Sequence, residues 1–318
     1  MKAEQLETNI FNICKKYTTN EQSKIVSKLI TLAEEKGVHS HGLHYFLWSV
    51  LPLIKEKKTK TPNIQVKGNF VYSNGENCIG LVNTYNCIKK ASKIAQSKGI
   101  SLVIIKNPGK VGALRIYCPE LMEKSQLVLM FKNTAPTACL ENVCLPFVGT
   151  NPICFGLPDS NYIYDTSITT VATNKLRLYK KMDKTFDSYV GLDKDGKLSR
   201  EPKKILKGGC LLPFSYFCFP YKSFFLGITI DLMSALAGGK TSIRVGESCG
   251  KRLYSKEGMI ILVIDSKVFP NYNDYLKEKD FLLNDLKEFK VPIPGTKNIK
   301  NIRLLEKDIK EMQKELKK

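Results

Sequence analysis

The 318-residue sequence lacks several patterns by which common classes of protein are recognised. No run approaches the roughly 20 apolar residues that a membrane-spanning helix requires, and the first residues lack the apolar core of a signal peptide. The ten cysteines are scattered singly without a C-x-x-C pair, so reduced thiols are expected instead of disulfides or a zinc knuckle. We therefore expect a soluble, cytoplasmic globular protein without membrane partners.

Arginine is scarce, although the chain is strongly basic. The formal net charge is +20, yet only six of the 50 basic residues are arginine, and the lysines are spread over the whole length. Nucleic-acid-binding proteins gather their basic residues into patches, often interleaved with aromatic residues. The sequence therefore favours an ordinary lysine-rich surface, which would attract small anionic ligands, and predicts no nucleic-acid partner.

The dinucleotide fingerprint G-x-G-x-x-G is missing, so a Rossmann domain is not supported. Apolar periodicity predicts helices at both ends of the chain, and alternating strands and helices in the middle. We expect a helical domain, 1–68 plus 224–318, around an inserted α/β domain, 69–223. The expected helices cover 6–17, the segment from the capping box at Thr18 to Gly37, 45–54, 81–98, 113–123, 169–182, 224–237, 275–288 and 303–316, and the expected strands cover 70–73, 102–106, 127–131, 162–165 and 259–264.

Histidine is rare, and all three histidines, His39, His41 and His44, fall within six positions. The unperturbed pKa of histidine lies closest to neutrality, so proton transfer at physiological pH is expected at this segment, with Ser40 able to orient or relay the proton. The spacing His-x-His-x-x-His also suits zinc. No carboxylate-rich motif lies nearby, so we favour proton transfer and expect no metal site.

Several short motifs follow one another along the chain: Ser40-His41-Gly42, Asn74-Gly75, Gly149-Thr150-Asn151-Pro152, Tyr221-Lys222 and Pro294-Gly295. Their order and spacing resemble the malate/L-lactate dehydrogenase type 2 family over nearly the whole chain. The resemblance implies an α/β fold that is not Rossmann-like, in which a helical domain carries the histidine motif and an inserted α/β domain holds NAD or NADP. It also implies a homodimer and a small carboxylic acid as substrate.

The resemblance further assigns roles to individual residues. His41 would exchange a proton with the substrate oxygen, Ser40 would relay that proton, and Thr150 would contact the substrate. The function implied is an NAD(P)-dependent oxidoreductase that interconverts a small 2-hydroxy acid and its 2-oxo acid. The other substrate-binding candidates are His44, Tyr45 and Asn151, and the cofactor-binding candidates are Val111, Gly112, Ala113, Leu114, Asp165, Thr166, Ser167, Lys175 and Lys222.

The sequence also departs from the family pattern. Tyr45 stands where family members typically carry an arginine that binds the substrate carboxylate, and Lys110 stands where they carry a histidine. We hypothesise that Lys110 is catalytic, either replacing that histidine or supplying the missing positive charge. Bulky residues at 220–225 replace glycines expected near the cofactor. These departures leave open an alternative, a homologue with impaired or absent catalysis that keeps the fold, with or without dinucleotide binding.

Overall fold

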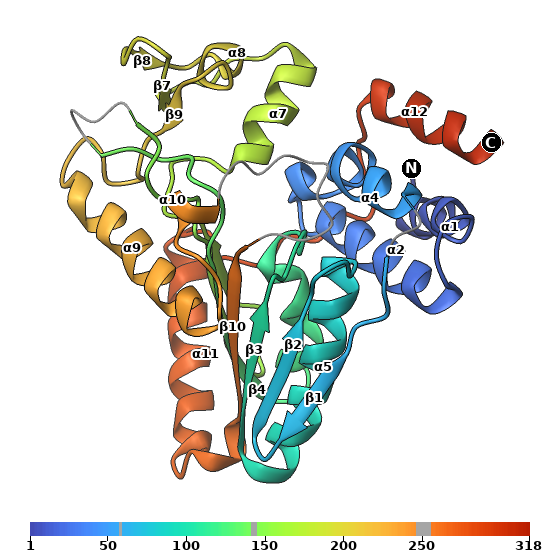
Figure 1. Ribbon diagram of the computed structural model, residues 1–318. Helices are drawn as coiled ribbons and strands as arrows, with labels where there is room; N and C mark the ends of the chain where they lie inside the picture. Colours follow the sequence, from blue (N-terminus) through green and yellow to red (C-terminus); the bar gives the residue numbers. More distant parts are fainter. Residues whose placement is uncertain (57–58, 141–144, 246–255) are drawn as a thin grey trace.

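The structure is a computed structural model that describes residues 1–56, 59–140, 145–245 and 256–318. A twisted sheet lies at the centre, with helices on both of its sides and a small separate sheet above one end (Figure 1). Cys144 and Cys249 lie outside the described residues. The eight cysteines within them are free, and all but Cys218 are buried.

The central sheet has seven strands in the order β1-β2-β3-β10-β4-β5-β6. Neighbouring strands are antiparallel except for the parallel pair β2 and β3. A doubly wound dinucleotide-binding domain has a mostly parallel sheet, so this topology agrees with the missing fingerprint. The strands are β1 (Ile64–Lys67), β2 (Phe70–Asn74), β3 (Ile100–Lys106), β4 (Gln126–Lys132), β5 (Ile153–Gly156), β6 (Ile163–Thr166) and β10 (Gly258–Asp265).

Strand β10 corrects one expectation. The helical domain expected from the sequence includes this segment, but β10 lies in the middle of the sheet and pairs along its length with β3 on one side and β4 on the other. Its residues are nearly all buried, which is why the strand reads as a continuous apolar run. Such a run shows that a strand is central without showing which sheet it joins.

The N-terminal helices α1 (Ala3–Cys14) and α2 (Asn20–Glu35) pack on each other, and α12 (Glu306–Lys317) packs on α1. Helix α5 (Gly80–Lys98) covers one face of the sheet and also contacts α2. One continuous cluster of buried side chains therefore runs from the N-terminal helices through α5 into the sheet, and includes Leu6, Leu29, Phe46, Leu81, Val103 and Ile261.

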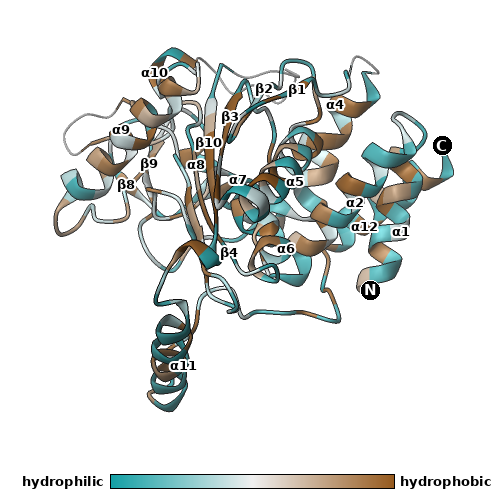
Figure 2. Cartoon of the chain, turned by 90° about the horizontal axis from the view of Figure 1, so that it is seen from below, coloured by the Kyte–Doolittle hydropathy of each residue, from teal (hydrophilic) through white to brown (hydrophobic). Residues whose placement is uncertain are grey.

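Helix α9 (Pro220–Leu236) packs against β10 and β4. Helix α11 (Tyr272–Glu288) has no buried residue, and Figure 2 shows it projecting away from the rest of the chain. No helix within the described ranges combines the length and the apolar character needed to cross a lipid bilayer. The remaining α-helices are α3 (Leu43–Tyr45), α4 (Leu51–Lys55), α6 (Pro119–Met122), α7 (Thr173–Met182), α8 (Pro202–Ile205) and α10 (Ser242–Val245), and the small sheet consists of β7 (Gly191–Leu192), β8 (Leu198–Ser199) and β9 (Cys210–Leu211).

Candidate active site

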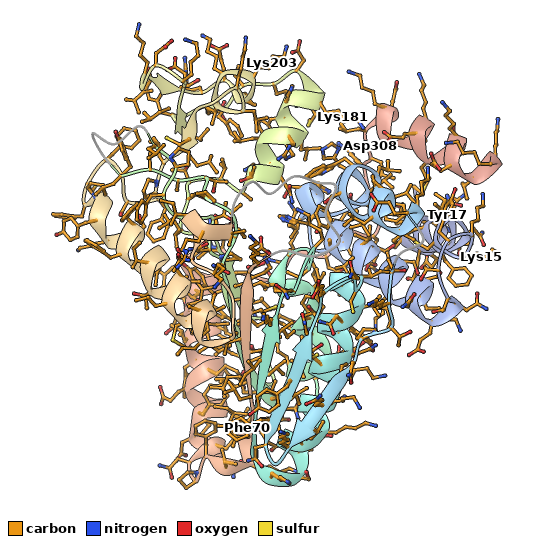
Figure 3. The ribbon with its side chains drawn as sticks, viewed as in Figure 1. Lys15, Tyr17, Phe70, Lys181, Lys203 and Asp308 are labelled. Atoms are coloured by element: carbon orange, nitrogen blue, oxygen red, sulfur yellow. The ribbon has the colours of Figure 1, made fainter. Side chains whose placement is uncertain are left out.

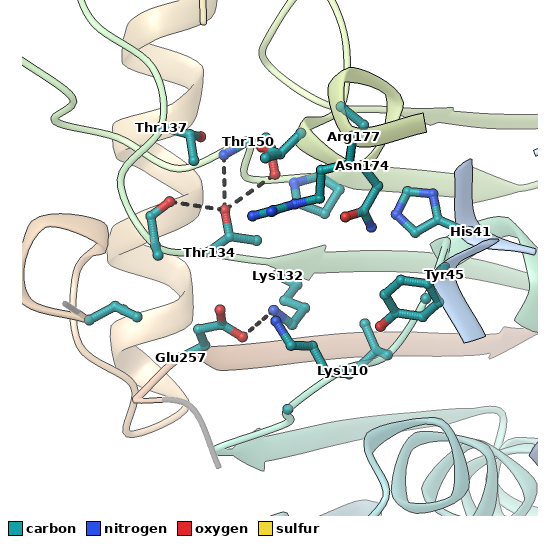
Figure 4. A pocket seen from close by; sticks show the side chains of 18 of the residues that line it. His41, Tyr45, Lys110, Lys132, Thr134, Thr137, Thr150, Asn174, Arg177 and Glu257 are labelled. Atoms are coloured by element: carbon teal, nitrogen blue, oxygen red, sulfur yellow. Dashed lines mark hydrogen bonds and ion pairs between the residues drawn. The ribbon is translucent and has the colours of Figure 1, made fainter. Parts of the chain in front are cut away.

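Two adjoining cavities surround the histidine segment. The smaller one has a volume of about 190 Å³ and lies among the histidine segment, the loop that follows β3, the end of β4, the start of β10, and helix α7 (Figure 4). Its polar or aromatic walls come from His41, Tyr45, Trp48, Lys110, Lys132, Thr134, Thr137, Thr150, Asn174, Arg177, Lys256 and Glu257.

The larger cavity is a groove of about 690 Å³ between the histidine segment, β6 and helix α7. Five residues line both spaces, so the groove and the smaller cavity share a boundary. The shared residues are His41, Gly112, Thr150, Pro152 and Ala172. Of the cofactor-binding candidates, the groove is lined by Gly112, Ala113, Leu114, Asp165, Thr166, Ser167 and Lys175.

His41 stands at that boundary, on the 3-10 turn η1 (His39–His41). Its Nδ1 lies 3.1 Å from the Ser40 hydroxyl oxygen, and its ring lies 5.4 Å from the ring of Tyr45. Burial lowers the pKa of His41 to about 4, and the positive charge of Arg115 adds to the effect. The imidazole is therefore neutral at pH 7 and able to accept a proton from a group in either cavity.

The other two histidines have acidic partners. His39 pairs through Nδ1 with Glu34, whose other carboxylate oxygen accepts a hydrogen bond from the backbone N–H of Leu43 at 2.8 Å. His44 is buried, with its Nδ1 3.5 Å from the carboxylate of Asp308. Figure 3 shows Asp308 beside Lys181, with which it forms an ion pair.

These contacts bear on the zinc interpretation of the histidine spacing. All three residues line the groove, but His39 and His44 contact acidic residues from different helices, whereas His41 also lines the small cavity. Within the part of the chain that the structure describes, no cluster of three or more metal-binding side chains occurs.

Asp165 is held in the groove wall by Arg115, which sequence reasoning did not single out. The backbone N–H and the Nε of Arg115 both donate to the Asp165 carboxylate, each at 3.2 Å, and Nη2 donates to its backbone carbonyl at 3.2 Å. Burial raises the pKa of Asp165, and the Arg115 guanidinium lowers it by a smaller amount. Arg115 therefore fixes the conformation of β6 where it borders the groove.

Three candidates lie elsewhere than expected. Val111 lines the small cavity instead of the groove. Asn151 is buried behind the wall, where its side chain accepts from the backbone of Thr134 and donates to the carbonyl of Gly227. Lys222 lines neither cavity, and its ammonium group lies 4.5 Å from the centre of the Phe219 ring.

The small cavity also contains groups that the sequence analysis missed. Lys132, the last residue of β4, forms a buried ion pair with Glu257, the residue before β10. In Figure 4 the end of Lys110 points toward the same carboxylate. The Thr134 hydroxyl accepts from the backbone N–H of Thr150 at 2.9 Å and lies 3.2 Å from its hydroxyl. These contacts hold Thr150 at the boundary between the two cavities.

A protein-family model described as malate/L-lactate dehydrogenase matches residues 1–309. The chain belongs to this family. It is similar to the malate/(S)-sulfolactate dehydrogenase of Methanothermus fervidus, with 25% identity over 306 residues that make up 94% of this chain and 89% of that protein. The L-sulfolactate dehydrogenase of Methanocaldococcus jannaschii is 24% identical and covers 99% of this chain and 94% of its own length. At such identities this is a divergent member of the malate/L-lactate dehydrogenase family.

Solved structures confirm the family fold. The Δ1-piperideine-2-carboxylate reductase from Pseudomonas syringae superposes with a TM-score of 0.84 at 21% identity, covering 99% of each chain. The sulfolactate dehydrogenase from Methanocaldococcus jannaschii superposes with a TM-score of 0.82, covering 100% of this chain and 96% of that one. The predicted mixed α/β, non-Rossmann fold is thus confirmed.

Proposed function

We propose that this member of the malate/L-lactate dehydrogenase family is an NAD(P)-dependent oxidoreductase that interconverts a small 2-hydroxy acid and its 2-oxo acid. The position of His41 carries the proposal, because its neutral imidazole lies between a small cavity suited to a substrate and a groove several times larger. The family match and the names of the relatives support the same class of reaction. No observation on the described residues favours a non-catalytic homologue.

In this proposal His41 acts on the substrate oxygen. When a 2-hydroxy acid is oxidised, the imidazole accepts the hydroxyl proton, and in the reverse direction it returns a proton to the carbonyl oxygen. Ser40 orients Nδ1, and Tyr45 and Thr150 form the surrounding walls. Lys110 remains a catalytic candidate because it lines the same cavity. Its charge would stabilise an anionic substrate, although the end of its side chain points toward Glu257.

The groove fits an extended anionic dinucleotide. Gly112, Ala113 and Leu114 line the groove, and so do the polar residues Thr166, Ser167 and Lys175. These residues would hold NAD or NADP, which supplies hydride transfer when bound. The volume falls in the range of sites that enclose most of a small ligand.

The direct test follows oxidation of NADH and of NADPH, each with oxaloacetate, pyruvate and 3-sulfopyruvate, by absorbance at the nicotinamide band. We expect turnover with at least one combination and reversal with the matching 2-hydroxy acid. Binding of either nucleotide without turnover of any acid would contradict the proposal and would instead indicate the non-catalytic homologue.

The lowered pKa of His41 predicts different pH profiles for oxidation of the 2-hydroxy acid and for reduction of the 2-oxo acid. Above about pH 4 the imidazole is neutral, so kcat/KM for the 2-hydroxy acid should be level from about pH 5 upward. Reduction needs the protonated ring, so kcat/KM for the 2-oxo acid should fall about tenfold for each pH unit over the same range. Initial rates in both directions at constant ionic strength test this, and a reduction profile that stays flat up to neutral pH contradicts it.

We also propose that the chain forms a homodimer through α9 and α11. Tyr221, Phe225, Leu232 and Leu236 recur at helical spacing along α9, and Leu232 and Leu236 are 60% and 77% exposed. Phe281 and Leu282 of α11 are exposed as well, at 65% and 59%. A second copy of the chain would cover these apolar faces, which a monomer would leave in water.

Charged residues at this surface should prevent association. We expect the Leu232→Glu/Leu236→Glu variant to sediment as a monomer at concentrations where the unaltered protein sediments as a dimer, because carboxylates at the centre of an apolar interface lose hydration without gaining a partner. The control is Val66→Glu on β1, at the far edge of the sheet, which should remain dimeric. A monomeric unaltered protein would exclude the homodimer.

A further inference from the structure

One side chain of the small cavity has no place in the mechanism above. Arg177 comes from α7, which packs against the turn that carries His41. The centre of its guanidinium lies 4.5 Å from the centre of the Trp48 ring, and Trp48 meets the ring of Tyr45 edge-on with centroids 6.3 Å apart. Tyr45 in turn contacts His41, so Arg177 belongs to a row of stacked side chains that ends at the proposed acid–base group.

Three other partly or wholly buried cations have acidic partners, and Arg177 differs from them. Lys132 pairs with Glu257, Arg115 with Asp165 and Lys181 with Asp308. Within the described ranges no ion pair involves Arg177, and its buried Nε has no hydrogen-bond partner. Burial lowers its pKa. Buried donors nearly always have an acceptor, so we expect a bound ligand to supply an acceptor for the Arg177 Nε.

The indole Nε1 of Trp48 is also buried without a partner among the described residues. Two donors without acceptors therefore lie next to each other in one wall of the cavity, since the guanidinium stacks on that indole ring. Arg177 and Trp48 come from separate parts of the chain and meet only at this wall.

The cavity as a whole favours an anion. Lysine and arginine contribute four of its lining residues, Lys110, Lys132, Arg177 and Lys256, whereas Glu257 is the one acidic residue among those that line it. Figure 4 shows the guanidinium of Arg177 reaching into the cavity toward Thr134 and Thr150, with Asn174 between it and His41. A planar guanidinium beside hydroxyl and amide groups matches the geometry of a carboxylate.

We propose that Arg177 is a specificity-determining residue that binds the carboxylate of the substrate through charge-assisted hydrogen bonds, while His41 meets the reacting oxygen. The inference rests on the proposed function and adds to it the residue that recognises the acid. Helix α7 thus supplies a cation to the cavity, whereas position 45 contributes the neutral, buried Tyr45.

Arg177→Met tests this, with Arg200→Met as a matched control. Arg200 is exposed and also lies over an aromatic ring, that of Tyr189, but it lines neither cavity. We expect kcat/KM for the 2-oxo acid to fall about ten- to 150-fold in Arg177→Met, mainly through KM, as loss of a charge-assisted hydrogen bond implies. The KM for the nucleotide should stay unchanged, and Arg200→Met should behave like the unaltered enzyme.

Two further readouts exclude a purely structural role. In a 2-oxo acid methylated on its C1 carboxylate, the group that Arg177 would bind carries no charge, so the unaltered enzyme and Arg177→Met should use this ester with the same low efficiency. Added guanidinium chloride should restore part of the lost activity of Arg177→Met with the free acid. An equal loss for acid and ester, or no loss at all, would overturn the role of Arg177 while leaving the proposed function in place.

If the unaltered protein turns over none of the acids, the proposed function fails and binding decides the role of Arg177 separately. Oxalate, an unreactive mimic of a 2-oxo acid, is titrated in the presence of NADH and of NADPH while the unfolding temperature is followed. Stabilisation that disappears in Arg177→Met but persists in Arg200→Met would support the acid site. Absent or equal stabilisation in all three proteins would overturn it.

Discussion

Replacing His41 with asparagine should lower kcat about 10²–10⁴-fold, the range expected when a positioned acid–base group is lost. Asparagine keeps a polar side chain of similar size but does not titrate near neutral pH. The nucleotide KM should change little, because the groove is formed mainly by other segments. Steady-state kinetics with the best acid from the substrate panel measures the loss, and the pH dependence of the residual rate should disappear with it.

His39→Asn provides the comparison within the same turn. The His39 ring is already paired with Glu34, so the variant should keep a kcat far closer to that of the unaltered enzyme. An equal drop in both variants would point to a disturbed 3-10 turn. A kcat in His41→Asn within a few-fold of the unaltered enzyme would remove His41 from the mechanism.

The second large effect concerns the buried ion pair between Lys132 and Glu257. Both side chains are almost fully enclosed, and the Lys132 ammonium also donates to the Asn133 carbonyl at 3.0 Å. Glu257→Gln leaves that ammonium without its carboxylate, so we expect the free energy of unfolding to fall by about 3–5 kcal/mol. Urea denaturation at a fixed protein concentration measures the change.

Two further variants provide comparisons for the loss expected in Glu257→Gln. Glu201→Gln breaks an exposed pair with Lys204 and should lower the free energy of unfolding far less than Glu257→Gln does, because water screens that pair. The double variant Lys132→Met/Glu257→Leu removes both charges together and should unfold less readily than Glu257→Gln alone. A loss in Glu257→Gln as small as that in Glu201→Gln would show that water reaches the pair in solution.

Local sequence patterns were enough to locate much of the candidate site. The histidine segment, Gly112 to Leu114, Thr150 and Asp165 to Ser167 are short contiguous motifs whose residue types resemble those of the family, and all of them line one or both cavities. The roles assigned to them stay predictions. Helix positions were also recovered wherever apolar residues repeat over several turns, as in α5 and α11.

What the sequence analysis missed depends on contacts between distant segments. Lys132 and Glu257 are 125 positions apart. Their ion pair cannot be predicted until the pairing of β4 with β10 is known. Arg177 stands in a helix rich in basic residues, and only the packing of α7 against the histidine turn distinguishes it from its neighbours. The helix expected over 113–123 is instead a 3-10 turn, Leu114–Tyr117, followed by the short α6 that begins at Pro119.

The place of β10 also has a consequence for how the chain reaches its native state during synthesis. Strands β1 to β3 and β4 to β6 are complete by residue 166, yet they share no edge until residues 258–265 have left the ribosome. Until then the apolar edges of β3 and β4 are both unpaired, and unpaired edges of this kind invite association between nascent chains. Joining the two halves requires closure of long loops, so this step should be slow and should make the chain depend on chaperones late in translation.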